Sequence, residues 1–374
     1  MATKTATTRL PSTKNLPSTM HAWQWTTCKT TLESALTLNP TAPLPSRPLR
    51  PGESLIRVHA ASVNPIDYKL PELPIVGRLA IPKPATPGLD FAGVVAEPGP
   101  KSALKVGQRV FGKLEPKQQY GTLGEYVIGS AAGTVPLPDG VSFEQGATLG
   151  ICGVVTYQGL VKNVKRGDRV LVNGGSGGTG TFAVQIAKAL GCEVVTTCSG
   201  ELRFQSQIWG SRGAHTNRCV GANVQLCKDL GADEVIDYRT QSVVSALEKG
   251  EKKLDFVLDN VGEPKALYWK APSFTKPGAR YVQIGSQVSL GFVFDLACRL
   301  ALPTWLGGGK TPFSFASAST NFNDYQGLAD LVVNGQVKPV IDEIYTFENA
   351  PKAYEKLRTG RTRGKIVVRV ANES

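Results

Sequence analysis

The sequence predicts an α/β protein that combines a β-rich, partly closed barrel with a doubly wound parallel sheet. Three observations predict this. Short strands separated by Gly and Pro turns fill the chain up to about residue 146. After residue 147, strands alternate with helices, which is typical of a parallel sheet covered by helices. A glycine-rich run, residues 173–180, lies between a strand and a helix of this second part.

The size and composition fit two folded parts and disfavour some functions. The chain has 374 residues, of which 41% are hydrophobic and 19% are charged. No apolar run reaches the roughly 18 residues that a membrane helix needs. The formal net charge is +12, but Lys and Arg are interspersed with Asp and Glu, so nucleic-acid binding is disfavoured. A basic surface suits an anionic cofactor equally well.

The cysteines and the N-terminus bear on the compartment. Seven cysteines, an odd number without a CxxC pair, predict free thiols in a reducing compartment, and we therefore expect a cytoplasmic protein. Residues 1–19 are rich in Ser and Thr and lack acids, so a disordered extension is expected before Met20. A mitochondrial presequence is the alternative, although Pro11 and Pro17 would interrupt its amphipathic helix.

The first part, residues 20–146, is expected to be a small barrel. Its apolar runs are short, alternate with polar residues and are bounded by turn signals such as Pro51-Gly52 and Pro98-Gly99. This spacing favours a partly closed barrel over a flat sheet. Strands are expected at residues 54–60, 91–96 and 122–128, and a turn followed by a strand is expected over residues 105–111.

The second part, residues 147–290, alternates strands with helices, and residues 291–374 are expected to return to the first part. Helices are predicted at 154–161, 182–190, 224–230, 324–334 and 350–357. Strands are predicted at 169–172, 193–197, 234–237, 256–259, 280–284 and 365–370.

The glycine run is typical of a dinucleotide-binding loop. Gly174, Gly177 and Gly180 form a GxxGxxG pattern in the strand–loop–helix context that supports this interpretation. Glycine lets backbone N–H groups approach a pyrophosphate, and the helix N-terminus favours negative charge. A flexible linker is the alternative. The residues expected to contact the phosphates are Gly174, Ser176, Gly177, Gly178, Thr179 and Gly180.

The end of the next strand favours NADPH over NADH. In NAD-binding versions an acid at this point holds the ribose 2′-hydroxyl. Here the strand ends in Thr-Thr-Cys-Ser-Gly with Ser199, and no acid occurs before Glu201. Lys228 and Arg239 are candidates to bind the 2′-phosphate, although either is as well explained as a solvated surface charge.

The chain resembles a quinone oxidoreductase of the medium-chain dehydrogenase/reductase superfamily from about Met20 to its end. The resemblance implies a GroES-like catalytic domain split around a Rossmann cofactor domain, with a cleft between them and homodimerisation through the cofactor domain. It rests on residues 60–69 (AASVNPIDYK), 87–95 (PGLDFAGVV), 106–112 (VGQRVFG), 230–238 (LGADEVIDY), 363–367 (RGKIV) and the glycine run.

The resemblance also implies that catalysis is independent of zinc. Zinc-dependent members hold the metal with a Cys near Asn64, a His in a Gly-His-Glu motif and a later Cys. Here the second motif is Gly88-Leu89-Asp90, and only Cys152 remains near the third position. One thiol cannot supply the three protein ligands of a catalytic zinc. We expect no metal, and Cys152 is expected to be a small buried residue at the domain junction.

Two residues of the resembling motif are candidates for catalysis. Hydride transfer to an enone or a quinone leaves negative charge on oxygen, which a hydrogen-bond donor would stabilise. The resemblance implies that Tyr68 is this donor and that Asn64 orients the nicotinamide or the substrate. The alternative is structural: Asn64 caps a turn and Tyr68 packs on the cleft wall. Asp67 is expected to be the N-cap of the helix there.

Further cofactor contacts follow from the same resemblance. Tyr238 is expected near the adenine. Loops at the carboxyl ends of parallel strands border bound ligands, so the nicotinamide ribose is expected beside two such loops. Lys365 is expected near the cofactor, with a strand-edge charge as the alternative. The loop residues are Asn260, Gly262, Gly285 and Ser286.

Residues 201–221 form an anomalous insertion. The segment has no regular period and interrupts a connection that usually takes about 2–6 residues. Removing it leaves an ordinary connection of the resembling family, so our hypothesis is a retained intron in the gene sequence. A genuine surface loop is the alternative.

The predicted activity is NADPH-dependent, zinc-independent reduction of a quinone or an α,β-unsaturated carbonyl. Alternatives are a trans-acting enoyl reductase of a biosynthetic complex and a non-catalytic NADPH-binding protein. Apolar residues at 70–83 and 292–315, including Trp305 and Phe313, favour a small hydrophobic substrate, although core packing would look the same.

Overall fold

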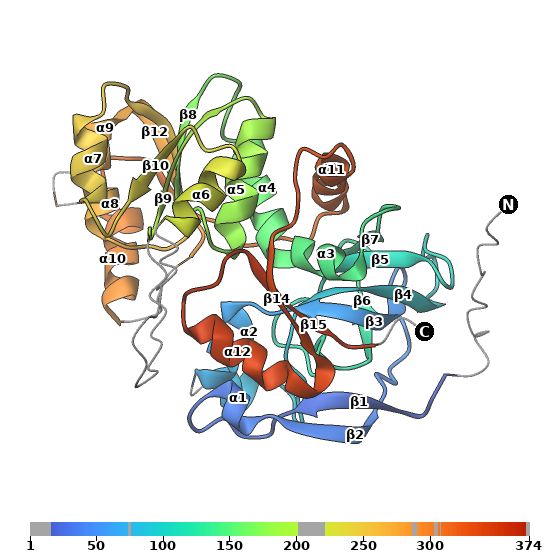
Figure 1. Ribbon diagram of the computed structural model, residues 1–374. Coiled ribbons are helices and arrows are strands. Elements are labelled where there is room, and N and C mark those ends of the chain that lie inside the picture. Colours follow the sequence, from blue (N-terminus) through green and yellow to red (C-terminus); the bar gives the residue numbers. More distant parts are fainter. Residues whose placement is uncertain are drawn as a thin grey trace, which may run out of the picture.

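The computed structural model describes residues 16–73, 76–200, 221–285, 290–302, 306 and 308–371. It consists of two lobes (Figure 1). The upper lobe in this view contains a parallel sheet with helices, and we call it the parallel lobe. The lower lobe contains mainly antiparallel strands, and we call it the antiparallel lobe. The chain passes from the antiparallel lobe to the parallel lobe and returns at its C-terminal end.

The antiparallel lobe is built on a seven-stranded sheet. Its central strand β3 is buried along most of its length, because alternate apolar side chains fill the core beneath it. The order is β14-β15-β3-β4-β5-β7, β6 also pairs with β3, and only β14 and β15 are parallel. The strands are β3 (Ser54–Ser62), β4 (Asp90–Pro98), β5 (Arg109–Lys113), β6 (Tyr126–Gly129), β7 (Thr134–Pro136), β14 (Ile341–Thr346) and β15 (Lys365–Arg369), and a separate pair is formed by β1 (Thr19–Gln24) and β2 (Thr37–Pro43).

Short helices complete this lobe. The helix α2 follows β3 and carries the motif at residues 64–68, and α12 precedes β15. The helices are α1 (Leu32–Ala35), α2 (Pro65–Glu72), α3 (Phe143–Thr148) and α12 (Ala350–Arg358).

The parallel lobe is a six-stranded sheet of order β10-β9-β8-β11-β12-β13 in which every pairing is parallel. Val170, Leu171 and Val172 on β8 are fully buried, as expected for a strand covered on both faces. The strands are β8 (Arg169–Asn173), β9 (Glu193–Cys198), β10 (Glu234–Asp237), β11 (Leu254–Asp259), β12 (Thr275–Gln283) and β13 (Phe313–Phe315). The helices are α4 (Val154–Val161), α5 (Gly178–Ala189), α6 (Ala222–Asp229), α7 (Val243–Lys249), α8 (Ala266–Trp269), α9 (Ala271–Phe274), α10 (Leu290–Ala301) and α11 (Phe322–Val333).

The predicted fold class is confirmed, and most differences concern where elements begin. The helix at residues 154–161 has the predicted bounds, whereas α5 begins four residues before the predicted start at 182 because the glycines at 178 and 180 are already helical. The strand predicted at 122–128 begins only at Tyr126. The turn and the strand predicted over residues 105–111 are both present, since Gly107, with a φ of 77°, lies in the turn and β5 begins at Arg109.

The insertion lies outside the described residues at positions 201–220, but its two flanks are close together. The backbone N–H of Gly221 donates to the carbonyl oxygen of Gly200 at 2.6 Å. Positions 1–15 of the expected N-terminal extension, Ser286 and Trp305 also lie outside the described residues.

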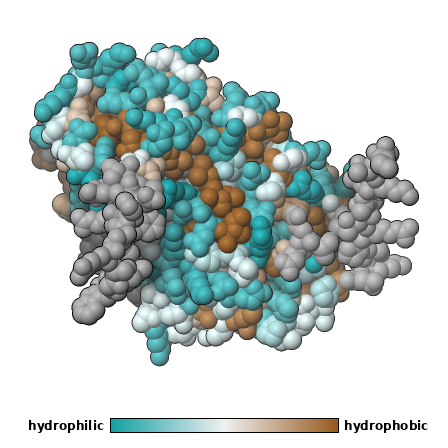
Figure 2. Space-filling view, viewed as in Figure 1, coloured by the Kyte–Doolittle hydropathy of each residue, from teal (hydrophilic) through white to brown (hydrophobic). Residues whose placement is uncertain are grey.

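The visible surface is mostly hydrophilic. Figure 2 shows hydrophobic residues gathered in a band that runs from the parallel lobe toward the junction with the antiparallel lobe. Among the described residues, no helix combines the length and the apolar character needed to cross a membrane.

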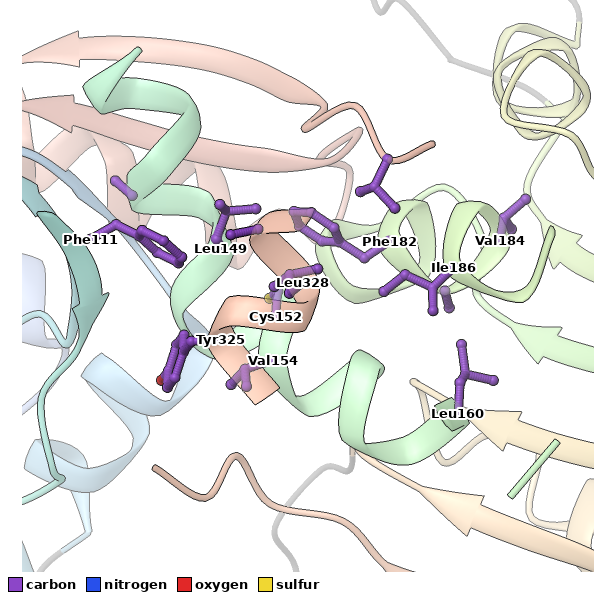
Figure 3. Close-up of a cluster of buried hydrophobic side chains, with 14 of the residues drawn as sticks. Phe111, Leu149, Cys152, Val154, Leu160, Phe182, Val184, Ile186, Tyr325 and Leu328 are labelled. Carbon is purple, nitrogen blue, oxygen red and sulfur yellow. The ribbon is translucent and has the colours of Figure 1, made fainter. Parts of the chain in front are cut away.

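One hydrophobic core runs through the junction. The chain leaves the antiparallel lobe through α3 and a π-helical turn, η2 (Leu149–Gly153), which leads directly into α4. Figure 3 shows Phe111 and Tyr325 at one end of this core, Leu149 and Cys152 in the middle, and Phe182 on α5 beyond them. Because interiors are densely packed, this shared core fixes the glycine loop relative to the antiparallel lobe.

Candidate active site at the junction of the two lobes

The glycine loop joins β8 to α5, and its glycines meet different surroundings. Gly174 has a φ of 83°, which favours glycine. A Cβ atom at Gly175 would lie 2.0 Å from Oγ1 of Thr196, and one at Gly180 would lie 2.0 Å from the carbonyl oxygen of Gly174, so both positions exclude side chains. A Cβ atom at Gly177 would contact only that same oxygen, at 3.8 Å. The space beside Gly177 is therefore open.

This open space lies where α5 begins. Gly177 is the N-cap of α5, and the first backbone N–H groups of a helix have no acceptor within the helix. These groups and the helix dipole favour an anion at this end. The loop therefore fits a dinucleotide pyrophosphate.

A buried polar network supports the loop from below. Asn173 donates to Oδ1 of Asp259 at 2.7 Å and accepts from Oγ1 of Thr197 at 2.6 Å. The same Thr197 hydroxyl oxygen accepts from the backbone N–H of Gly174 at 2.9 Å. The hydroxyl of Tyr281 donates to Oδ2 of Asp259 at 2.5 Å. The sequence does not predict these residues as a network, although Asn173, Thr197 and Asp259 are polar residues at the end of a strand or next to it.

The loop after β11 contains an amide group that has no hydrogen-bond partner among the described residues. Oδ1 of Asp259 accepts from the backbone N–H groups of Val261 and Gly262 at 3.0 and 2.8 Å, which shapes the loop. Both polar side-chain atoms of Asn260 are buried and have no hydrogen-bond partner among the described residues. A Cβ atom at Gly285 would lie 1.9 Å from the carbonyl oxygen of Asn260, so the two strand-end loops are in contact. A ligand held here would satisfy the orphaned amide.

The end of β9 carries no carboxylate of its own. Ser199 accepts two hydrogen bonds from Nδ2 of Asn223, through its backbone oxygen at 2.9 Å and its hydroxyl oxygen at 3.1 Å. At the end of the neighbouring strand β10, Oδ1 of Asp237 accepts from the backbone N–H groups of Gly200 and Arg239 at 2.9 and 3.0 Å. One oxygen of this carboxylate is therefore engaged by the backbone.

A tyrosine and a cationic side chain follow the end of β10. Tyr238 is 52% exposed, and its backbone N–H donates to the carbonyl oxygen of Cys198 at 3.1 Å. Arg239 is exposed beside it in the sequence. Lys228 is also exposed, but it lies in the last turn of α6, whose first turn contacts Ser199 through Asn223.

The strand β15 brings the glycine loop against the antiparallel lobe. Gly364, which precedes β15, forms an isolated parallel bridge with Gly177, and its N–H donates to the carbonyl oxygen of Ser176 at 3.0 Å. A Cβ atom at Gly178 would lie 3.0 Å from Cδ of Lys365 and 3.5 Å from Sγ of Cys152. The start of α5 therefore rests on the side chain of Lys365.

Lys365 is 3% exposed, and its ammonium group lies among polar atoms of the antiparallel lobe and η2. Nζ is 2.6 Å from Oδ1 of Asn64, 3.1 Å from the carbonyl oxygen of Val63, 3.5 Å from Sγ of Cys152 and 3.6 Å from Oδ2 of Asp90. We call Asn64, Asp90, Cys152 and Lys365 the lysine cluster. The sequence predicted Asn64 and Lys365 as site residues but not Asp90.

The carboxylate of Asp90 is fully buried and fully engaged. Oδ1 accepts from the backbone N–H of Ile151 at 2.8 Å, and Oδ2 accepts from Nδ2 of Asn64 at 2.8 Å and from Oγ of Ser62 at 3.1 Å. Burial raises the pKa of Asp90, and the nearby Lys365 ammonium opposes this shift. Burial disfavours the charged form of Lys365, but Cys152 and the two neighbouring aspartates outweigh it and raise its pKa. The cluster therefore contains a cation that keeps its proton.

The start of α2 differs from expectation in one respect. Asn64, not Asp67, is the N-cap of α2, and Oδ2 of Asp67 accepts from the backbone N–H of Asn64 at 2.8 Å, as the third helical residue does in a capping box. Burial raises the pKa of Asp67 well above its ordinary value, and the charge of Asp90 adds to this. The Asn64 amide is held by Lys365, Asp90 and the carbonyl oxygen of Ser62.

Tyr68 lies one helical turn after Asn64 but outside the lysine cluster. Its ring packs under the guanidinium of Arg358 on α12, at 4.0 Å, and Arg358 also pairs with Glu33 and Glu72. Burial raises the pKa of Tyr68, although the charge of Arg358 opposes this. Within the part of the chain that the structure describes, the hydroxyl has no hydrogen-bond partner.

A small cavity lies beside α2, with an accessible volume of about 40 Å³. Its walls are mainly apolar, and the predicted substrate segment 70–83 contributes Leu70 and Ile81. Phe313, from the other predicted segment, instead packs edge-on against Tyr268 in the core of the parallel lobe. The apolar lining comprises Trp25, Ile66, Leu70, Ile81, Ala85 and Leu89.

The described residues contain no group of three or more His, Cys, Asp or Glu side chains that could hold a metal ion. The position where the sequence analysis sought zinc ligands instead contains Asn64, Asp90 and Cys152 around the ammonium of Lys365. Cys152 is 8% exposed and is a free thiol.

Comparisons with known proteins agree with this architecture. The alcohol dehydrogenase GroES-like domain family matches residues 50–139, and the zinc-binding dehydrogenase family matches residues 230–368. The chain is 43% identical over 368 residues to the trans-enoyl reductase pgmF of Aspergillus terreus, covering 95% of this chain and 97% of that protein. It is 32% identical to a human mitochondrial NAD(P)H oxidoreductase, covering 86% and 82% of the two chains. The structure of a quinone oxidoreductase from Coxiella burnetii is 28% identical and superposes with a TM-score of 0.76, covering 94% of this chain and 99% of that one.

Proposed function

The chain belongs to the medium-chain dehydrogenase/reductase superfamily and is an oxidoreductase; on that premise we propose that it reduces a quinone or an α,β-unsaturated carbonyl with NADPH, without zinc. The observation that carries this proposal is the contact at β15. There the glycine loop, whose Gly177 borders open space, meets the Asn64 motif of the antiparallel lobe through Gly364 and Lys365. A cofactor held at the loop and a substrate beside α2 would meet at this contact.

The residues around the loop fit a nicotinamide dinucleotide. The N-terminal N–H groups of α5 would bind the pyrophosphate, and the Asn260 amide would contact the nicotinamide ribose, with Gly262 and Gly285 in the same two loops. When bound, the reduced nicotinamide supplies the hydride. Tyr238 would lie near the adenine.

We assign NADPH rather than NADH on the surroundings of Ser199. The strand β9 ends without a carboxylate that could accept from the ribose 2′-hydroxyl of NADH, and Asp237 at the end of β10 already accepts from two backbone N–H groups at Oδ1. Arg239, on this edge, would bind the 2′-phosphate through a charge-assisted hydrogen bond.

Tyr68 and Asn64 have separate roles in the proposed reaction. Hydride transfer leaves negative charge on the substrate oxygen, and the unpartnered Tyr68 hydroxyl would donate its proton there, directly or through a water molecule. Because the Asn64 amide is held on three sides, it would orient the reactants as a fixed dipole. The apolar walls beside α2 would exclude water and favour a hydrophobic substrate.

A second candidate is a trans-acting enoyl reductase, which reduces an acyl chain held by another protein. The 43% identity to the trans-enoyl reductase of Aspergillus terreus favours it. Both candidates use the same loop and the same cluster, so only the form in which the substrate is presented separates them.

The test is NADPH oxidation, followed by absorbance, with quinones, enones and enoyl thioesters bound to coenzyme A or a carrier protein. Each reaction is repeated with NADH and after incubation with a metal chelator. Turnover with free quinones or enones that prefers NADPH and survives the chelator supports the first candidate. Turnover confined to enoyl thioesters supports the second. Loss of turnover with the chelator would contradict zinc independence.

A further inference from the structure

The side chain of Lys365 and the backbone next to it contact both lobes at the site. Its ammonium contacts Asn64, Asp90 and Cys152, which come from the α2 cap, from β4 and from η2. Its alkyl chain lies against Gly178 at the start of α5. A lysine at a strand edge would be solvated, whereas this one is 3% exposed.

The ammonium is fully satisfied, so it is a fixed charge rather than a mobile one. Its three N–H donors face the Asn64 amide oxygen, the Val63 carbonyl oxygen and the Cys152 sulfur, with the Asp90 carboxylate 3.6 Å away. The amide orientation of Asn64 follows from this arrangement, because its oxygen accepts from Lys365 and its nitrogen donates to Asp90.

The backbone beside Lys365 makes the second half of the connection. The N–H of Gly364 donates to the carbonyl oxygen of Ser176, and Lys365 N–H donates to the carbonyl oxygen of Val340 at 2.8 Å. Gly364 also has a φ of 82°, and a Cβ atom there would lie 2.3 Å from that Val340 oxygen. These contacts restrain the start of β15. The backbone of Gly364 contacts the glycine loop, and the side chain of Lys365 contacts the other residues of the lysine cluster.

We propose that Lys365 is a positioning residue for hydride transfer, a resident cation that fixes the Asn64 amide and the start of α5 relative to each other. The inference rests on the proposed function. In this proposal, the side chain of Lys365 supplies the positive charge that lies between Asn64, Asp90 and Cys152. The glycine loop is then held at a fixed distance from α2. The reacting carbon of a nicotinamide bound at this loop would be held at a fixed distance from α2 as well.

A purely structural role and a positioning role are separated by a charge-neutral pair of substitutions. Lys365→Met leaves the Asp90 carboxylate buried without its cation, so this variant is expected to lose thermal stability. Adding Asp90→Asn removes the orphaned charge, and the double variant is expected to regain a melting temperature near that of the native chain. The double variant still lacks the cation, so its kcat is expected to stay about 10²-fold or more below the native value, with the Kd for NADPH within about threefold of native.

The experiment measures the melting temperature, NADPH affinity, the fluorescence of bound NADPH and kcat for the native chain, both variants and Lys365→Arg. Lys188→Met, which removes a lysine paired with Asp233 on the parallel lobe, is the control and should leave all four unchanged. Lys365→Arg keeps the positive charge but places a larger, planar guanidinium in the buried cluster, so it should lower kcat less than Lys365→Met does. A double variant with native kcat overturns the proposal, as does Lys365→Met with native kcat.

The failure of the proposed function gives a different result. If the native chain oxidises no NADPH with any substrate, that function is wrong, and the fluorescence readout then decides on Lys365. A positioning role predicts that the emission of bound NADPH differs between the native chain and the stable double variant. Identical emission spectra would overturn the positioning role even without turnover.

Discussion

The phenol ring of Tyr68 lies beneath the guanidinium group of Arg358, whose central carbon is 4.0 Å from the ring centroid. Nε of Arg358 is also 2.6 Å from the Glu33 carboxylate, and the same guanidinium pairs with Glu72. These contacts involve the face of the ring and not its hydroxyl group. The ring and the hydroxyl of Tyr68 can therefore be tested separately.

Tyr68→Phe should lower activity without affecting the fold. The substitution keeps the ring beneath Arg358, so the free energy of unfolding should change by less than about 0.5 kcal/mol. Because burial raises the pKa of Tyr68, its hydroxyl is protonated near neutral pH and able to donate. Its removal should lower kcat about 10²-fold in the NADPH oxidation assay. Unchanged kcat together with unchanged NADPH affinity would exclude Tyr68 as the donor.

Gly177→Ala should weaken cofactor binding in a normally folded protein. The backbone of Gly177 is extended, with a φ of −81°, and a Cβ atom would enter open space, so folding should be unaffected. That space is where we place the pyrophosphate, and the Kd for NADPH should rise about tenfold or more. Gly180→Ala is the contrasting variant, because its Cβ atom would lie 2.0 Å from a backbone oxygen and should destabilise the fold. Tight NADPH binding by Gly177→Ala, measured by fluorescence titration, would move the pyrophosphate site elsewhere.

Arg239→Ala should reduce the preference for NADPH. This variant retains the Arg239 backbone N–H, which donates to the Asp237 carboxylate, and loses only the exposed guanidinium. If this group binds the 2′-phosphate, the Kd for NADPH should rise about tenfold, whereas the Kd for NADH should not change. Lys228→Ala is the matched variant for the other candidate cation, which is exposed in the last turn of α6. A drop in NADPH affinity confined to Lys228→Ala would transfer the role to Lys228.

The sequence predicted what local patterns encode. The helix at residues 154–161 was predicted with its observed bounds because its period lies within one element. The glycine loop was recognised because its pattern spans a few residues between a strand and a helix. The contact between Asn64 and Lys365 joins residues 301 positions apart, and no periodicity reports it. Asp90 was noticed only as a departure from a zinc motif, although it lies at the centre of the lysine cluster.

Two further features depended on tertiary structure. The capping role of Asp67 was assigned to the wrong helix position, because Asn64 and Asp67 can each cap a helix and only the backbone distinguishes them. The network of Asn173, Thr197 and Asp259 requires the order β9-β8-β11, which places strand ends from distant parts of the chain side by side.

Deleting residues 201–220 should preserve the fold. The backbone N–H of Gly221 donates to the carbonyl oxygen of Gly200 at 2.6 Å, so the two ends of the segment are already neighbours. Joining them requires a local rearrangement of these two residues rather than a large movement of β9 or α6. Because a long loop costs closure entropy, the melting temperature should stay constant or rise. A fall in the melting temperature or in NADPH affinity would show that the segment contributes to the folded protein.

Acid should destabilise the protein partly through His59. This residue on β3 stacks on the ring of Phe143, with a centroid distance of 4.4 Å, and its Nδ1 is buried without a partner among the described residues. Burial, with the charges of Arg57 and Arg109, lowers the pKa of His59 to about 4. In the unfolded chain the pKa is about 6.5, so between these two values the unfolded state binds more protons. The stability that this difference in the pKa of His59 contributes is therefore fully present above pH 6.5 and is lost as the pH falls toward 4.

His59→Phe keeps the stacked ring and removes the titration. Urea unfolding of the native chain at pH 7 and pH 4.5 should show a loss of free energy of unfolding that exceeds the loss in the variant by about 1 to 2 kcal/mol, since solvent screens part of the ring. The comparison between the two proteins cancels the contribution of carboxyl groups such as Glu53 and Asp233, which titrate in both. Equal losses in both proteins would show that His59 is protonated in the folded state at pH 4.5, and that the ring is more hydrated than its packing on Phe143 indicates.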